Sequence, residues 1–243
     1  MPVAPVTEPP AIGWYGKLPC AGDFVHRRLA HRLVTAIDEW LRDGLAMLRT
    51  SDPQWRGAYE GAPIWNCAIP AAVTRSGYTL VGLIAPSHDR VGRDFPLCAG
   101  VALPPHASPA ALLDGAHEWL AELGRAVGAA LARPTSIEAF DEAVLAIVLP
   151  IGSPSLLSGA GGDDILSILN DSGLDVPTVP MPLAHALPWP ELPLQFDPAG
   201  TTSYWWTNTG NGGPLRGFTS DAGLSPSLLL TLMRQPGGAG ASR

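Results

Sequence analysis

The chain has 243 residues, of which 46% are hydrophobic and 15% charged, so it can form the core of a single α/β domain and is not a wholly disordered chain. Its net charge of −7 is concentrated in residues 101–243, where five Lys and Arg face thirteen Asp and Glu. Because an acidic chain repels nucleic-acid phosphates unless its basic residues cluster, nucleic acid is not an expected partner.

The first hundred residues start with a segment that lacks periodicity. Residues 1–11 contain four prolines and predict a flexible leader. Ile12–Leu18 is a candidate first strand, and apolar residues at spacings of three and four predict an amphipathic helix over Leu29–Leu48. A short helix is expected over Pro53–Tyr59, with Asp52 as its N-cap.

Three strand-like runs follow, each bounded by Pro, Gly or Ser. They are Pro63–Ile69, Tyr78–Ala85 and Phe95–Leu103. A parallel return would need a crossover of roughly a dozen residues or more, so the short connections favour antiparallel neighbours.

Helical periodicity returns after residue 108. A helix over Pro109–Ala132 is predicted, capped by Ser108, and a short helix follows over Ser136–Glu142. The continuous apolar run Val144–Leu149 is typical of a buried strand.

The remainder is rich in Gly and Pro before order returns near the end. Residues 150–200 are expected to be loop-rich, with one short helix near Asp163–Leu169. The closing elements are predicted in the order strand, tight turn, strand and helix: Thr202–Thr207, Asn211-Gly212, Leu215–Phe218 and Pro226–Met233.

Together these elements predict an α/β protein of the α+β type with a single domain over residues 12–235. The domain is expected to have a central mixed, largely antiparallel sheet of about six strands with helices packed against it, followed by a flexible tail over 236–243. The adjacent pair Trp205-Trp206 lies in the strand Thr202–Thr207, where alternation sends the two indoles to opposite faces; a sheet covered on both faces would bury both.

Cysteine usage and the absence of targeting patterns indicate a reducing compartment. The three cysteines, Cys20, Cys67 and Cys98, are odd in number and form no CxxC pair. The N-terminus has no signal-peptide pattern, and no apolar run is long enough to cross a membrane. We therefore expect a cytoplasmic protein without a membrane span.

Gly13 to Val25 form the densest cluster of glycine and charged residues. Such a segment could present backbone N–H groups and Lys17 to an anion, but it lacks the GxxxxGK[ST] and GxGxxG spacings. The simpler interpretation is a strand followed by a tight turn, with Asp23 near the entrance of the first long helix.

A second cluster places Ser87, His88 and Asp89 side by side between two predicted strands. Adjacent residues point in different directions and no GxSxG elbow surrounds Ser87, so a catalytic triad is disfavoured. The favoured interpretation is a hairpin loop in which Ser87, Asp89, Arg90, Arg93 and Asp94 form hydrogen bonds and ion pairs, with the arginines also available to a partner.

The six histidines and the acidic residues show no pattern of metal ligation. There is no HExxH motif, and Asp163-Asp164 lacks the repeated acidic positions of a calcium loop. We expect no metal and no cofactor.

Five short motifs occur in order along the chain: GxYGKLPxxGDFVxR over Gly13 to Arg27, Trp40-Leu41, APxW over Ala62 to Trp65, PSxDRVGRxFPL over Pro86 to Leu97, and SxWWT over Ser203 to Thr207. In order and spacing they resemble the motifs of the TagF family of bacterial type VI secretion. The departures are His88, where an apolar residue is expected, and Cys20, where a small residue such as Ser is common.

This resemblance implies an accessory protein rather than an enzyme. TagF members are described as post-translational repressors that hold the secretion apparatus inactive, acting through a forkhead-associated scaffold protein, and no catalytic residues come with that description. Some members are fused to a PP2C-type phosphatase, which we do not expect in this chain.

Two functions of other classes stay open beside the binding regulator. One is a small hydrolase or phosphatase-like enzyme that uses Ser87, His88 or Asp89, and the other is a structural assembly factor. For the binding regulator, the candidate partner-binding residues are Lys17, Asp23, Asp89, Arg90 and Arg93.

Overall fold

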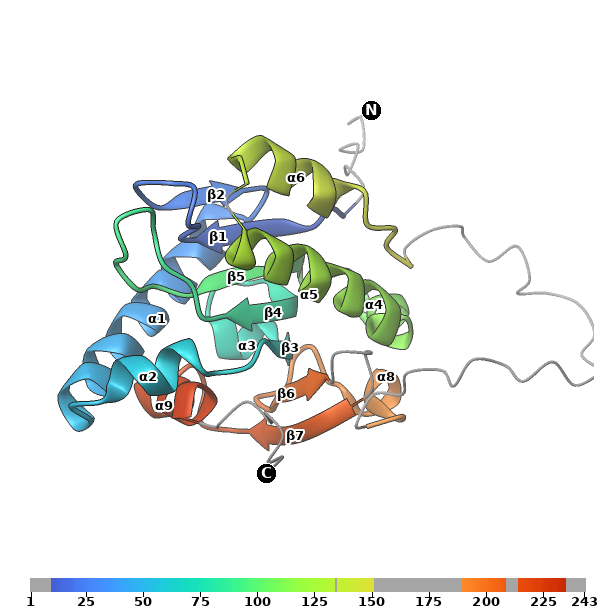
Figure 1. Cartoon of the computed structure of the whole chain (residues 1–243). Coiled ribbons are helices and arrows are strands. Elements are labelled where there is room, and N and C mark those ends of the chain that lie inside the picture. Colours follow the sequence, from blue (N-terminus) through green and yellow to red (C-terminus); the bar gives the residue numbers. More distant parts are fainter. Residues whose placement is uncertain (1–9, 134, 151–188, 209–213, 235–243) are drawn as a thin grey trace, which may run out of the picture. The chain divides into compact units, whose positions relative to one another are not determined.

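Seven strands form one antiparallel sheet in the computed structural model, which describes residues 10–133, 135–150, 189–208 and 214–234 (Figure 1). The expected helix near Asp163–Leu169, the turn at Asn211-Gly212, the tail 236–243 and nearly all of the leader lie outside these ranges. The strands run in the order β2-β1-β5-β4-β3-β6-β7 across the sheet. They are β1 (Gly13–Gly16), β2 (Val25–Arg27), β3 (Trp65–Ile69), β4 (Thr79–Ala85), β5 (Leu97–Leu103), β6 (Ser203–Asn208) and β7 (Pro214–Ser220).

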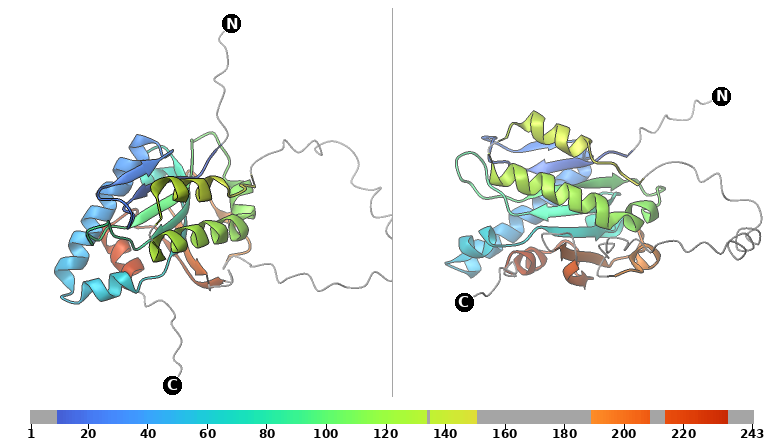
Figure 2. Two further views of the ribbon diagram at one scale, coloured as in Figure 1. Left: turned by 45° about the horizontal axis from the view of Figure 1, so that its top comes forward. Right: turned by 45° about the vertical axis from the view of Figure 1, so that its right-hand side comes forward.

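Helices cover both faces of the sheet (Figure 2). One face packs against α1 (His31–Ser51), α2 (Trp55–Glu60) and α9 (Pro226–Arg234). The other packs against α4 (Ala110–Asp114), α5 (Ala116–Ala132) and α6 (Ile137–Leu145). Two further helices are single turns: α3 (Ala71–Thr74) and α8 (Leu192–Gln195).

The α+β sheet expected from the sequence is confirmed, with seven described strands in place of about six and antiparallel pairing in every described pair. The central hairpins β3-β4-β5 follow the chain order that the short connections predicted. The additional strand is β2, whose three residues are too few to show an apolar alternation.

Two hydrophobic cores lie on opposite faces because neighbouring strand residues point in opposite directions. In β1, Trp14 belongs to the core under α5 and α6, whereas Tyr15 belongs to the core under α1. In β6, Trp205 and Trp206 divide in the same way, and both are 0% exposed. The prediction that a doubly covered sheet buries both indoles is therefore confirmed.

Buried indole N–H groups fasten α9 to the rest of its layer. Trp65 Nε1 donates to the carbonyl of Leu232 at 2.9 Å, and Trp40 Nε1 donates to the carbonyl of Ser225 at 2.8 Å. Because a buried donor without a partner is costly, these bonds fix how the closing helix packs on α1 and β3.

Two predicted elements differ in the structure. The apolar run Val144–Leu149 is not a strand: α6 continues to Leu145, with Phe140 and Val144 buried one turn apart, and a short apolar run cannot by itself distinguish the two structures. The helix expected over Pro109–Ala132 is interrupted at Gly115, where an added Cβ would lie 2.8 Å from the Pro150 ring.

Asp52 does not cap α2 as expected. The N-cap of that helix is Gln54, and the Asp52 carboxylate accepts a hydrogen bond from the Gln54 backbone N–H at 2.8 Å. Ser108 likewise is not the N-cap of α4, which is Pro109, although its hydroxyl accepts from the Ala110 N–H at 3.3 Å.

A partly exposed ion pair joins α6 to the segment that follows β2. Arg28, whose φ of 58° is in the left-handed region, directs its guanidinium onto both carboxylate oxygens of Asp141 at 2.6 and 2.9 Å. Trp14 Nε1 donates to the same carboxylate at 2.7 Å. The hydrogen bonds from Arg28, reinforced by the one from Trp14, lower the pKa of Asp141 against the opposing effect of its partial burial.

Close packing of α1 on α9 predicts an unusual response to alanine at Gly44. A Cβ there would lie 2.6 Å from Leu229 Cβ, so the approach of the two helices requires glycine. Although alanine favours a helix over glycine by about 1 kcal/mol, overpacking costs roughly 1–3 kcal/mol. We expect Gly44→Ala to lower the free energy of unfolding, measured by urea denaturation.

Gly124→Ala is the matched control, because Gly124 lies within α5 and an added Cβ would meet nothing within 4 Å. This control should raise the free energy of unfolding by up to about 1 kcal/mol. A Gly44→Ala protein as stable as the control would contradict the packing that we describe.

Candidate functional site

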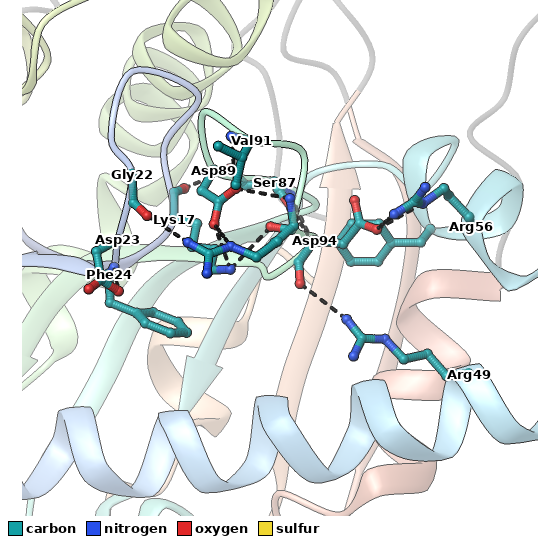
Figure 3. A network of polar contacts seen from close by, with 12 residues as sticks. Lys17, Gly22, Asp23, Phe24, Arg49, Arg56, Ser87, Asp89, Val91 and Asp94 are labelled. Atoms are coloured by element: carbon teal, nitrogen blue, oxygen red, sulfur yellow. Dashed lines mark hydrogen bonds and ion pairs between the residues drawn. The ribbon is translucent and has the colours of Figure 1, made fainter.

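Two turns that are far apart in the sequence lie side by side at one end of the sheet (Figure 3). The first joins β1 to β2 over residues 17–24, and the second joins β4 to β5 over residues 86–96. The Arg90 N–H donates to the Ala21 carbonyl at 2.8 Å, and the Arg93 guanidinium donates to the Gly22 carbonyl at 2.7 Å. Both sequence clusters therefore belong to one structural unit.

Glycine at position 16 permits this approach. Its φ of 141° is strained for other residues, and an added Cβ would lie 2.2 Å from the Pro96 carbonyl oxygen. The first turn can thus leave β1 directly beside the second.

The carboxylate of Asp89 lies at the centre of the unit and is 0% exposed. Its Oδ2 pairs with Lys17 Nζ at 2.9 Å and with Arg93 Nε at 2.7 Å. Its Oδ1 accepts from the backbone N–H groups of Val91 at 3.1 Å and Arg93 at 2.9 Å. Four donors from two turns therefore satisfy one buried charge.

The electrostatic balance at Asp89 favours the ionised form. Burial acts to raise the pKa of this carboxyl, but the hydrogen bonds from Arg93, Lys17 and the Val91 N–H outweigh burial and hold the pKa far below its usual range. The group is thus a permanent anion at neutral pH.

Ser87 and Tyr59 extend the network into α2. The Ser87 hydroxyl donates to the Lys17 carbonyl at 2.7 Å. The Tyr59 hydroxyl donates to the Ser87 carbonyl at 2.7 Å and accepts from the Ser87 N–H at 2.9 Å. These bonds fasten the start of the second turn to a helix and to the first turn at once.

Asp94 anchors the end of the second turn to two helices. Its carboxylate accepts from Nε and a terminal nitrogen of Arg56 at 2.9 and 2.8 Å, and its backbone carbonyl accepts from Arg49 at 3.4 Å. Figure 3 shows Arg49 and Arg56 reaching Asp94 from α1 and α2. Both ends of the loop are therefore held.

Five exposed residues form the tips of the paired turns, and we call them the tip surface: Asp23, Phe24, Arg90, Val91 and Arg93. Two are apolar, with Phe24 42% and Val91 68% exposed. The Phe24 ring stacks with Tyr15 at a centroid distance of 5.9 Å and makes a T-shaped contact with Phe95 at 4.7 Å.

The five candidate residues from the sequence divide into two groups. Asp23, Arg90 and Arg93 are exposed, whereas Lys17 and Asp89 are buried and cannot themselves contact a partner in this structure. The prediction that Lys17 and Asp89 lie on the exposed surface is wrong, because each is the other's buried counter-ion. Asp23 also lies in the β1–β2 turn, where it accepts from the Phe24 N–H, and not at the entrance of α1.

Sequence reasoning missed Phe24 and Val91. The available signal was an apolar residue at the tip of a turn, directly next to charged residues. The favoured interpretation of the second cluster, a loop joined by hydrogen bonds and ion pairs, is confirmed for Ser87, Asp89, Arg93 and Asp94.

No catalytic triad forms at Ser87. Within the part of the chain that the structure describes, Ser87 bonds to Lys17 and Tyr59, Asp89 bonds to Lys17 and Arg93, and neither is hydrogen-bonded to the exposed His88. A pocket of about 220 Å³ lies beside Ser87 and His88, but Asp89 does not line it.

The cysteines and the potential metal ligands form no second candidate site within the described residues. Cys67 and Cys98 are fully buried free thiols, and burial raises the pKa of Cys98 to about 12. Among the described ranges, no three His, Cys, Asp or Glu side chains gather in a way that could hold a metal ion.

Comparison with known proteins decides the family. A family model described as "TagF N-terminal domain, Type VI secretion system-associated" matches residues 13–147, which include both turns and the helices that hold them. The chain belongs to the TagF family. A search of curated proteins finds no significant match.

A solved structure has a similar fold over nearly the whole chain. The crystal structure of PA0076 from Pseudomonas aeruginosa PAO1, at 2.05 Å resolution, is similar to this chain with a TM-score of 0.64 and 24% sequence identity. The match covers 96% of this chain and 97% of that one. In the described part of this TagF-family chain, no helix combines the length and the apolar character needed to cross a membrane.

Replacement of the central carboxylate provides a test of the network. We expect Asp89→Asn to lower the free energy of unfolding by about 3–5 kcal/mol, because it leaves the buried Lys17 ammonium without its counter-ion. Asp23→Asn, at an exposed carboxylate of the same unit, should change it by less than about 0.5 kcal/mol. Equal effects of the two substitutions, measured by urea denaturation, would contradict a central role for Asp89.

The lowered pKa of Asp89 also predicts the pH dependence. A carboxyl whose folded pKa lies below its unfolded value of about 3.9 contributes its full stability above that pH. The contribution declines as the pH falls toward the folded pKa. The difference in unfolding free energy between wild type and Asp89→Asn should therefore be constant from pH 7 to pH 5 and shrink below pH 4.

Proposed function

We propose that this chain is a non-enzymatic accessory protein of type VI secretion. In this proposal it represses the apparatus post-translationally by binding a cytoplasmic forkhead-associated scaffold protein. Membership of the TagF family supports the secretion role. The scaffold and the repression follow what the resemblance to that family implies.

The tip surface is the observation that carries a binding function. Exposed arginines and aromatic side chains are enriched at protein interfaces. An interface binds more tightly when its side chains and loops are already ordered, because no conformational entropy is then lost on binding. Here Arg90, Val91 and Phe24 are exposed on turns whose deeper groups are already paired. The surface is thus suited to recognition without rearrangement.

Charge reversal at Arg90 tests this proposal. The Arg90 side chain is exposed, so Arg90→Glu should leave the fold intact while placing a like charge against an acidic contact. We expect a folded Arg90→Glu chain to lose co-purification with the scaffold by about tenfold or more, measured by quantitative pull-down from cells. Arg125→Glu, on α5 and 71% exposed at its side chain, is the matched control and should co-purify as wild type does.

A substitution at His88 separates the regulator from a hydrolase. His88 is exposed and is the residue that a Ser87-based mechanism would need as its base. We expect His88→Ala to retain full repression of secretion, measured as the release of a secreted marker protein. A loss of repression by a folded, scaffold-binding His88→Ala chain would favour the enzyme.

Deletion of the gene distinguishes the repressor from a structural assembly factor. Removal of a repressor gives excess secretion, whereas removal of an assembly factor abolishes it. We expect the excess, restored to the wild-type level by the wild-type gene supplied separately.

A further inference from the structure

The tip surface carries a positive charge on an otherwise acidic chain. Lys17 and Arg93 both pair with Asp89, which leaves one positive charge in that cluster, while Arg90 and Asp23 balance each other at the tips. The whole chain has a net charge of −7. A surface of net positive charge attracts an acidic partner.

Of the two tip arginines, Arg90 is the one whose guanidinium is not paired with Asp89. Its backbone is fixed by the bond from its N–H to Ala21 and by the Val91 N–H bond to Asp89. Its guanidinium lies over Gly22, where an added Cβ would be 3.3 Å away, and it makes no hydrogen bond or ion pair within the described residues. A guanidinium is matched in shape and charge to a carboxylate, which it can bind through two parallel N–H bonds.

Exposed apolar side chains occur on both turns. Val91 follows Arg90 at the tip of the second turn, and Phe24 exposes part of its ring on the first turn. Lys17 lies 5.1 Å from the Phe24 ring centre, which places the ring beside the buried ion pair. A binding segment that only neutralised the arginines would leave these apolar surfaces in water.

We propose that the tip surface binds an acidic protein segment in which Asp or Glu carboxylates surround an apolar side chain. A carboxylate pairs with Arg90, and the apolar side chain packs on the neighbouring Val91. This inference rests on the proposed function, since it names the chemistry that the scaffold must present. It identifies the recognised group as a carboxylate and assigns the specificity to Arg90.

Synthetic peptides test the chemistry without the scaffold. The probe is a fluorescein-labelled peptide with glutamates on both sides of a central leucine, and its partner peptide has glutamine in place of every glutamate. Fluorescence anisotropy with the full chain should show the glutamate peptide bound about tenfold or more tightly than the glutamine peptide, with an affinity that falls as salt is added. Equal binding of the two peptides, or no binding of either, would overturn the inference.

Variants of the chain assign the contact to residues. Arg90→Gln should weaken binding of the glutamate peptide about tenfold, and Arg90→Lys should weaken it less, because a lysine keeps the charge but not the two parallel donors. Val91→Ser should also weaken it, and Arg125→Gln should not. Undiminished binding by Arg90→Gln would overturn the assignment.

The same proteins titrated with the purified full-length scaffold separate the two proposals. If the glutamate peptide binds as expected and the wild-type chain does not bind the scaffold, the proposed function fails and the inference stands. If the scaffold binds wild type and Arg90→Gln equally, and the peptide does not bind, the inference fails and the proposed function stands.

Discussion

The buried carboxylate of Asp89 is the constraint on which the candidate site depends. An ionised carboxylate away from water is tolerated only when its oxygens are fully paired, and here four donors meet it from two separate turns. Lys17 reaches Asp89 from the end of β1, so the pair also links the position of that strand to the loop after β4. Neither turn can move away without leaving a charge unpaired.

This constraint extends from the centre of the unit to its helices. The Tyr59 hydroxyl bonds to the N–H and the carbonyl of Ser87. Arg56 bonds to the Asp94 carboxylate, and Arg49 bonds to the Asp94 backbone carbonyl. A loop of this length would ordinarily be among the more mobile parts of a fold. Here its interior side is fastened to α1 and α2, so the exposed side chains at its tip are held in position without contributing to the core themselves.

The sequence predicted the elements that local pattern determines and missed those that distant contacts determine. The periodicity of α1 and the hairpins of β3 to β5 are local, and both were predicted. The pairing of β1 with β5 and of β6 with β3 joins segments far apart in the chain, and no local signal specifies such neighbours. Lys and Asp in a turn are usually exposed, so the burial of Lys17 and Asp89 follows only once the two turns are known to meet.

Asp89 and Ser87 both serve the structure of the second turn. A general acid or base has to exchange a proton near neutral pH, whereas the pKa of Asp89 is held far below that range by donors it cannot release without unfolding the loop. Ser87 as a nucleophile would first have to abandon the Lys17 carbonyl, and the same bond joins the two turns. Ser87 and Asp89 therefore both take part in building the loop. The exposed groups of the unit include the Arg90 guanidinium, Val91 and part of Phe24, which are the groups that the proposed partner binding uses.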